Sequence, residues 1–119
     1  MEKDCIFCKI IRSEIPSKKY YEDNNFLAIF DIAPIANSHI VLMSKTHYDN
    51  VGDMNESEWQ SFMNIARMLA EKIVTEIGAD GYNILVNQGE AGQSLVNHRP
   101  HCHIIPRFLE DGIKIDPRG

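Results

Sequence analysis

The residues most able to do chemistry lie in a histidine-rich segment, residues 97–107, which reads Asn-His-Arg-Pro-His-Cys-His-Ile-Ile-Pro-Arg. If residues 101–105 are extended, successive side chains point to opposite faces, so His101 and His103 share one face while Cys102 lies on the other. A neutral imidazole offers a lone pair for nucleophilic attack, and a neighbouring imidazole can handle the proton. The spacing alone leaves equally open that both histidines are ordinary core or surface residues.

A glycine-rich loop follows a strand-like segment in residues 81–94. Gly89 and Gly92 permit positive φ angles and close approach of the backbone. The N–H groups of Gln93 and Ser94 could therefore converge on a phosphate. Because glycine-rich turns are common, this pattern is weak evidence by itself.

The three cysteines give an odd count without a spaced disulfide framework, which is typical of a reducing compartment. Cys5 and Cys8 form a Cys-x-x-Cys pair that could bind Zn²⁺ if two further ligands are supplied. A redox pair or two buried thiols are the alternatives, although a thioredoxin-like role lacks its βαβ context. Cys102 is expected to pack in the core.

The elements that must position these residues can be predicted from hydrophobic periodicity. Apolar residues recur at steps of three and four between residues 56 and 77, which predicts a long helix with a core-facing stripe. Asn55 with Glu58 resembles a capping box, and Gly78 lies just past the last apolar position, where a left-handed residue is expected.

Short apolar or alternating segments bounded by turn residues predict strands on both sides of this helix. Residues 23–25, Asp-Asn-Asn, are a plausible hairpin turn between the first two strands. Strands, one long helix and further strands give an α+β fold with an antiparallel meander sheet. The predicted strands are Lys19 to Glu22, Phe26 to Phe30, His39 to Met43, Tyr82 to Val86 and His101 to Pro106, and a short N-terminal helix is predicted over Ile6 to Ile11.

Length and charge limit the possible partners. The 119 residues are one domain's worth of chain, so we expect a single domain over residues 1–119. The net charge is −5 with dispersed basic residues, which argues against binding to long nucleic acid but allows a small anion. No apolar run is long enough for a membrane span and the N-terminus is too polar for a secretory signal, so we expect a cytoplasmic protein.

Five ordered segments together make the sequence resemble the histidine-triad (HIT) family of nucleotidyl hydrolases and transferases. The final motif places the middle and last histidines of the triad on His101 and His103. The first falls on Arg99 when counted back from the end of the motif, whereas His98 can supply it through a bulge next to Pro100. Ser38 and Ser44 replace the glycine and proline usual in the family. The five segments are Cys5-Ile6-Phe7-Cys8-Lys9-Ile10, Phe30-Asp31-Ile32-Ala33-Pro34, Ser38-His39-Ile40-Val41-Leu42-Met43-Ser44-Lys45-Thr46-His47, the loop of residues 87–94, and His101-Cys102-His103-Ile104-Ile105-Pro106-Arg107.

The resemblance implies a HIT-like fold and cleavage of nucleoside phosphoramidates or related nucleotide conjugates through a nucleotidyl-histidine intermediate. His101 would be the nucleophile, and His103 and His39 would donate hydrogen bonds to phosphate oxygens. No acidic metal-binding cluster is visible, so no Mg²⁺ requirement is expected. The nucleotide-binding residues implied by the family are Asp31 at the ribose hydroxyls, Ile32 at the base, Asn87 near the ribose or phosphate, and Gly92, Gln93 and Ser94 around the phosphate.

The resemblance also implies a homodimer, a weak preference for purine nucleotides and a structural Zn²⁺ site. Bacterial members with this opening complete the Cys5 and Cys8 pair with two histidines, which here are His47 and His98. Two other functions remain open: a zinc-stabilised nucleotide-binding or sensing module with little turnover, and a dinucleoside-polyphosphate hydrolase or nucleotidyl transferase. A histidine at position 103 favours hydrolysis, because related transferases and phosphorylases often carry glutamine there.

Overall fold

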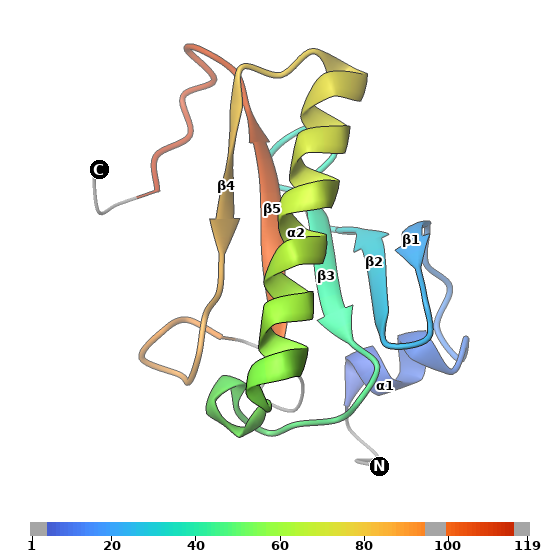
Figure 1. The fold of residues 1–119 in the computed structure, drawn as a ribbon. Coiled ribbons are helices and arrows are strands. Elements are labelled where there is room, and N and C mark those ends of the chain that lie inside the picture. Colours follow the sequence, from blue (N-terminus) through green and yellow to red (C-terminus); the bar gives the residue numbers. More distant parts are fainter. Residues whose placement is uncertain (1–4, 95–99, 116–119) are drawn as a thin grey trace.

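A computed structural model describes residues 5–94 and 100–115 (Figure 1). Five antiparallel strands form one sheet, and the fold is α+β, as predicted. The described elements are α1 (Ile6–Ile11), β1 (Lys19–Glu22), β2 (Phe26–Phe30), β3 (Ile40–Ser44), the 3₁₀ turn η1 (Val51–Asp53), α2 (Glu56–Ile77), β4 (Gly81–Leu85) and β5 (His101–Arg107).

The order of the strands across the sheet is β1-β2-β3-β5-β4. The chain passes from β3 through α2 to the edge strand β4, and β5 then enters between β3 and β4. The histidine-bearing strand is therefore central, with a partner strand on each side. This position fixes both its register and the direction of its side chains.

Alternation along the strands divides the buried side chains between two faces of the sheet. On β2 and β3, Ala28 and Leu42 belong to the cluster that includes residues of α2, whereas Ile29 and Val41 belong to the cluster that includes residues of α1. Cys102 of β5 lies in the α2 cluster. The period of two makes the neighbours of Cys102 face the α1 side.

The long helix covers one face of the sheet, where Figure 1 shows α2 running over β5 and β3. Its N-terminus carries the Asn55 half of the predicted capping box, because Asn55 Oδ1 accepts the Glu58 N–H at 2.8 Å. The Glu58 carboxylate accepts hydrogen bonds from Ser44 and Tyr48, which ties the helix start to the end of β3. Gly78 ends the helix with a φ of 71°, as predicted.

The short helix α1 packs against the opposite face of the sheet. Phe7 and Ile10 lie in one cluster with β2 and β3 residues such as Leu27 and Met43. Six residues are too few for an independently stable helix, so this packing must stabilise it. Within the part of the chain that is described, neither helix has the length and apolar character that a membrane span needs.

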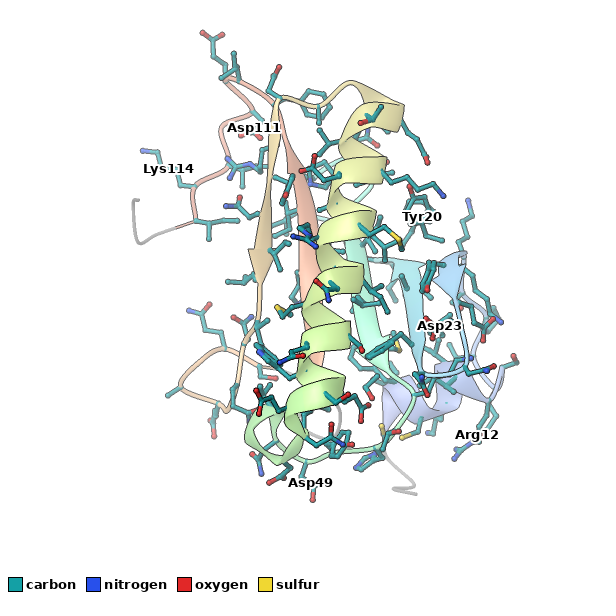
Figure 2. The ribbon with its side chains drawn as sticks, in the orientation of Figure 1. Arg12, Tyr20, Asp23, Asp49, Asp111 and Lys114 are labelled. Atoms are coloured by element: carbon teal, nitrogen blue, oxygen red, sulfur yellow. The ribbon has the colours of Figure 1, made fainter. Side chains whose placement is uncertain are left out.

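The two basic side chains labelled in Figure 2 lie far apart in that view. Arg12 and Lys114 lie at opposite sides of the molecule in that view, with Asp111 near the second of them. Arg107 is held by Asp111 through its Nε and Nη2 atoms at 2.8 and 2.9 Å. The guanidinium of Arg107 is therefore engaged in a bidentate ion pair within the protein.

Candidate functional site

Two of the predicted catalytic histidines lie side by side on β5. His101 pairs with Met43 and His103 with Val41 of β3, so both side chains emerge on the α1 face. Their ring centroids are 5.3 Å apart with the planes nearly perpendicular. His101 is 5% exposed, whereas His103 retains partial access to solvent.

His39 joins this pair from the residue just before β3. Its Nε2 lies 2.9 Å from Nδ1 of His103, and its Nδ1 accepts the N–H of Ile35 at 3.3 Å. An Nδ1 that accepts carries no proton, so the ring proton is on Nε2 and is donated to His103. His103 must then carry its own proton on Nε2, which makes that nitrogen a hydrogen-bond donor.

Burial keeps these two imidazoles neutral. Desolvation lowers the pKa of His39 below its ordinary value, against the opposing attraction of Asp31. The pKa of His103 is lowered by desolvation first and by repulsion from His39 second, again against Asp31. Neutral rings near pH 7 can exchange protons and donate hydrogen bonds without electrostatic repulsion of one another.

Asp31 follows β2 and stands beside both histidines. Its N–H donates to the carbonyl of His39 at 2.8 Å, and its Oδ1 accepts the N–H of Ala33 at 2.8 Å. Its Oδ2 lies 3.6 Å from His39 Nε2 and 3.9 Å from His103 Nδ1. The carboxylate is thereby held in one orientation next to the histidine pair.

Asp31, His39 and His103 are close enough together to hold a metal ion, since their ligand atoms lie within 4.8 Å of one another. The hydrogen bonding favours a different use. The nitrogen of His39 that would coordinate the ion carries the proton, and moving this proton to Nδ1 would set it against the N–H of Ile35. The cluster is arranged as a hydrogen-bonded relay.

A pocket of about 270 Å³ opens in front of His101 and His103 on the α1 face of the sheet. This volume is close to the lower end of the range for small-molecule sites, about 300 Å³. Asp31 is its charged residue, and most of its wall is apolar. The lining residues are Ile6, Phe7, Ile10, Ile15, Pro16, Ser17, Ile29, Asp31, Ile32, Val41, Asn87, Gln93, His101 and His103.

The wall supplied by α1 includes functional candidates that the sequence reasoning missed. Phe7 contacts His101 edge to face, with ring centroids 4.9 Å apart, and Ile6 and Ile10 line the same pocket. The available signal was the apolar spacing within the predicted short helix, where Ile6 and Ile10 are one turn apart. Nothing in that spacing indicated which strand the helix would cover.

Most of the predicted nucleotide-binding residues border this pocket. Ile32, Asn87 and Gln93 line it together with Asp31, although Ile32 is 89% exposed and lies at the rim. Ser94 is buried, and Gly92 is required by the tight loop because a Cβ there would lie 2.4 Å from the carbonyl oxygen of Gln88.

Two backbone N–H groups of this loop bear on the sequence prediction. The N–H of Gln93 donates to Glu90 and that of Ser94 donates to Gly89, at 2.9 and 3.1 Å. The turn itself therefore uses these two N–H groups in this arrangement, and their convergence on a phosphate stays a prediction. Glycine content alone does not show where the backbone donors go.

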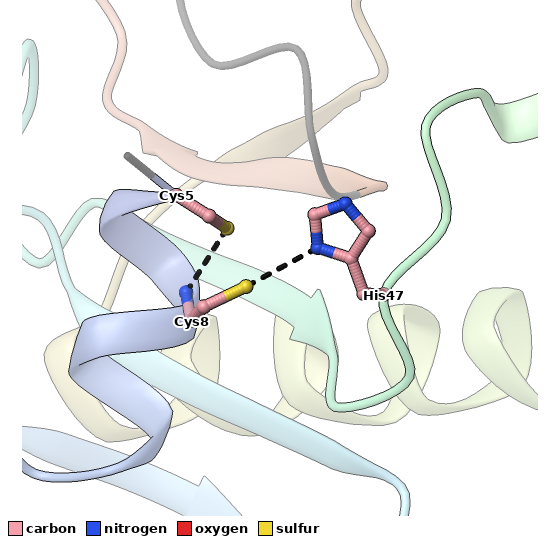
Figure 3. Close-up of side chains that lie close together, drawn as sticks. All are labelled: Cys5, Cys8 and His47. Atoms are coloured by element: carbon pink, nitrogen blue, oxygen red, sulfur yellow. Dashed lines mark hydrogen bonds between the residues drawn. The ribbon is translucent and has the colours of Figure 1, made fainter. Parts of the chain in front are cut away.

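A second cluster of side chains brings together three of the four predicted metal ligands (Figure 3). Cys8 Sγ lies 3.2 Å from His47 Nδ1, and Cys5 Sγ accepts the N–H of Cys8 at 3.2 Å. The three ligand atoms lie within 4.8 Å of one another, and both cysteines are fully buried. His47 Nε2 is 3.2 Å from Asp49, an outer partner of the kind that orients metal-bound imidazoles. Two thiols and one imidazole suit Zn²⁺.

The fourth predicted ligand, His98, lies outside the described residues. The same is true of Arg99, so the choice between these two for the first triad position also falls outside them. Cys102 is fully buried on the α2 face, as predicted, and burial raises the pKa of its thiol to about 12. Such a thiol is unreactive at neutral pH.

Comparisons with known proteins decide the family. Residues 12–110 match the HIT domain. An uncharacterised HIT-like protein of Methanocaldococcus jannaschii is 43% identical over 91% of this chain and 82% of its own length. The chain belongs to the HIT family.

Two HIT relatives carry names that state an activity. An adenosine 5'-monophosphoramidase of Schizosaccharomyces pombe is 34% identical over 90% of this chain and 77% of its own length. An adenylylsulfatase of Arabidopsis thaliana is 37% identical over 93% of this chain, which spans only 56% of that relative. The HIT family thus includes hydrolases of nucleotide conjugates.

Solved structures share the fold. A Streptococcus mutans protein has a TM-score of 0.92 at 33% identity and covers all of this chain and 75% of its own. A zinc-bound histidine-triad protein of Mycobacterium smegmatis has a TM-score of 0.88 at 32% identity and covers 97% of this chain and 84% of its own. The α+β prediction, with one long helix and an antiparallel sheet, is confirmed.

Proposed function

We propose that this protein hydrolyses nucleoside phosphoramidates or related conjugates in which a purine nucleotide is joined to a leaving group through its α-phosphate. The observation that carries the proposal is the pair of imidazoles facing one pocket, His101 beside the relay from His39 to His103. The family supports nucleotide hydrolysis at a general level, since relatives are named monophosphoramidase and adenylylsulfatase.

In the first step, a lone pair of His101 forms a nitrogen–phosphorus bond as the bond to the leaving amine breaks. The amine departs with the electron pair and takes up a proton from solvent. The protonated Nε2 of His103 donates to a non-bridging oxygen, where negative charge shifts during the transfer. His39 maintains that protonation state through its bond to His103 Nδ1.

In the second step, water attacks the nucleotidyl-histidine. A phosphorus–oxygen bond forms, the bond to His101 breaks, the ring recovers its lone pair, and the attacking water releases a proton to solvent. The same hydrogen-bond donors assist this step, because the shift of charge onto the oxygens is similar. Dividing one slow displacement into two lowers the barrier to each.

The remaining candidates are proposed to bind the nucleotide. The fixed carboxylate of Asp31 suits two ribose hydroxyls, and the apolar wall with Ile32 suits the base. Asn87 and Gln93 border the same pocket and can hydrogen-bond to the ribose or phosphate. Gly92 and Ser94 support the loop that carries Gln93.

Cys5, Cys8 and His47, with His98 as fourth ligand, are proposed to hold a structural Zn²⁺, which would cross-link the N-terminus of α1 to the loop after β3. Protein purified without chelators or affinity metal should contain near one zinc per chain. A Cys5→Ser variant should lose it. Metal-free fresh protein would contradict this part and leave the hydrolase proposal standing.

Three further features are also proposed: a homodimer, on the family resemblance; a cytoplasmic location, on composition and cysteine usage; and one HIT domain formed by residues 1–119, on chain length. No step of the mechanism above calls for Mg²⁺, so excess chelator for that ion should leave turnover unchanged.

The test is incubation with adenosine 5'-phosphoramidate and measurement of released AMP. Wild-type protein should release AMP at a rate at least a thousandfold above that of His101→Ala. Equal rates in the two proteins would exclude the proposal that the protein is a hydrolase. AMP binding without turnover would favour a nucleotide-binding module. Cleavage of a dinucleoside polyphosphate faster than of the phosphoramidate would indicate a dinucleoside-polyphosphate hydrolase.

A further inference from the structure

The six-residue helix α1 lies between the two candidate sites and contributes to both. Cys5 at its N-cap and Cys8 in its first turn belong to the metal cluster. Ile6, Phe7 and Ile10 line the nucleotide pocket. Neighbouring residues of this one short helix therefore belong to two different candidate sites.

Phe7 links the two sites directly. It stands between the two cysteines in the sequence, and its ring contacts His101 edge to face at 4.9 Å with an interplanar angle of 76°. Phe7 is 9% exposed, so its position is set by its packing. A displacement of α1 would move this ring relative to the proposed nucleophile.

The metal cluster fixes the same helix to the strand that bears the pocket. Cys8 of α1 contacts His47, which follows β3, and β3 supplies Val41 to the pocket wall and pairs with His101 and His103 of β5. A short helix has little stability of its own. An ion held by Cys5, Cys8 and His47 would therefore restrict α1 to the position that forms the pocket.

We propose that metal binding at Cys5, Cys8 and His47 and nucleotide binding in the pocket stabilise each other through α1, with Phe7 as the positioning residue between them. This coupling rests on the proposed function. Each ligand orders the helix that the other requires, so the second ligand bears less of the ordering entropy. The effect must be reciprocal: whatever factor the metal adds to nucleotide affinity, the nucleotide adds to metal affinity.

The test measures zinc affinity by competition with a chromophoric chelator, with and without saturating AMP, against a protein-free blank for zinc binding by AMP itself. AMP should tighten zinc binding by about tenfold. Calorimetric titration of AMP into zinc-loaded and zinc-free protein should give the same factor. Both readouts are binding constants and do not depend on turnover.

Two matched substitutions separate this route from simple stabilisation of the whole fold. Phe7→Leu keeps all metal ligands and should reduce the coupling factor to near one. Phe62→Leu removes the same atoms from the core on the α2 face and should leave the factor at about ten. Coupling that is equal in both variants would overturn the proposal, since any ligand stabilises a folded state against an unfolded one.

The other outcomes are also decisive. If zinc-loaded protein does not bind AMP, the proposed function fails and the coupling fails with it. If the protein does not bind zinc, the coupling is overturned while hydrolysis stands. If AMP binds and zinc affinity is unchanged, only the coupling is overturned.

Discussion

The two faces of the sheet are covered very differently. On one face α2 extends over 22 residues, and its side chains Phe62, Leu69 and Ile73 are fully or almost fully buried against the strands. On the other face α1 has six residues and shares its covering with an open pocket. The first face can provide most of the apolar burial, and the second leaves room for a ligand.

Strand β5 divides these two tasks between adjacent residues. Cys102 packs into the α2 cluster with no access to solvent, while His101 and His103 face the pocket. Substitutions on the two faces should therefore differ in kind as well as in size. Those on the α2 face should change stability, and those on the α1 face should change binding and chemistry.

The largest expected effect is a difference in stability between alanine substitutions at two phenylalanines, one on each face of the sheet. Phe62→Ala should lower the free energy of unfolding by about 3–5 kcal/mol, because it leaves a cavity in a closed core. Phe7→Ala should cost less, about 1–3 kcal/mol, because its ring already borders an open pocket. Urea denaturation measures both.

The effects on AMP affinity of the folded variants should have the reverse order. Phe7→Ala should bind AMP more weakly than wild type, and Phe62→Ala should bind it about as tightly as wild type. Equal losses of stability, or equal losses of AMP affinity, would mean that the two faces do not divide the work in this way.

A smaller effect is expected for neighbours on β5. His103→Gln should reduce the rate of phosphoramidate hydrolysis by about 100-fold, because it removes the imidazole donor beside His101. Cys102→Ala is the matched control and should stay within about twofold of wild type in rate, with about 1 kcal/mol lost in stability. Steady-state kinetics measure the rates, and denaturation measures the stability. Comparable losses of rate in the two variants would refute the claim that adjacent residues of β5 serve chemistry and packing separately.

The smallest effect concerns pH. The pKa values of His39 and His103 are lowered in the folded protein, so the unfolded chain, with histidine pKa near 6.5, binds more protons below that pH. This contribution to the free energy of unfolding is fully present above about pH 7.5 and is lost as the pH falls below about 6.5 and through the lowered pKa values of the folded protein.

Urea denaturation of wild type and His103→Gln at about pH 5.5 and pH 7.5 isolates this contribution. Wild type should lose more stability on acidification than the variant does. Identical losses in the two proteins would show that His103 is not held neutral by burial.

The sequence was sufficient for elements whose signals are local. The predicted ranges for α1, α2, β1 and β2 match the structure, because hydrophobic period, the Asn55 cap and Gly78 act within a few residues. β3 was predicted one residue early and β4 one residue late. Their ends depend on the register with neighbouring strands, which sequence period does not fix.

Features that depend on distant contacts were not predictable from spacing. The insertion of β5 between β3 and β4, and the turn η1, depend on how the chain packs around α2. The relay from Ile35 through His39 to His103 joins residues far apart in the sequence, and so does the contact of Phe7 with His101. The resemblance named the histidines, but their hydrogen bonding required the folded arrangement.

The central claim is that His101 attacks the α-phosphate and carries the nucleotide. Mixtures of enzyme and adenosine 5'-phosphoramidate, quenched within one turnover in alkaline denaturant because the nitrogen–phosphorus bond is labile in acid, and analysed by intact mass spectrometry, test it most directly. Wild-type protein should gain the mass of one adenylyl group, located on the peptide that contains His101, and His101→Ala should gain none. Hydrolysis without any such adduct, or an adduct that persists in His101→Ala, would contradict the account.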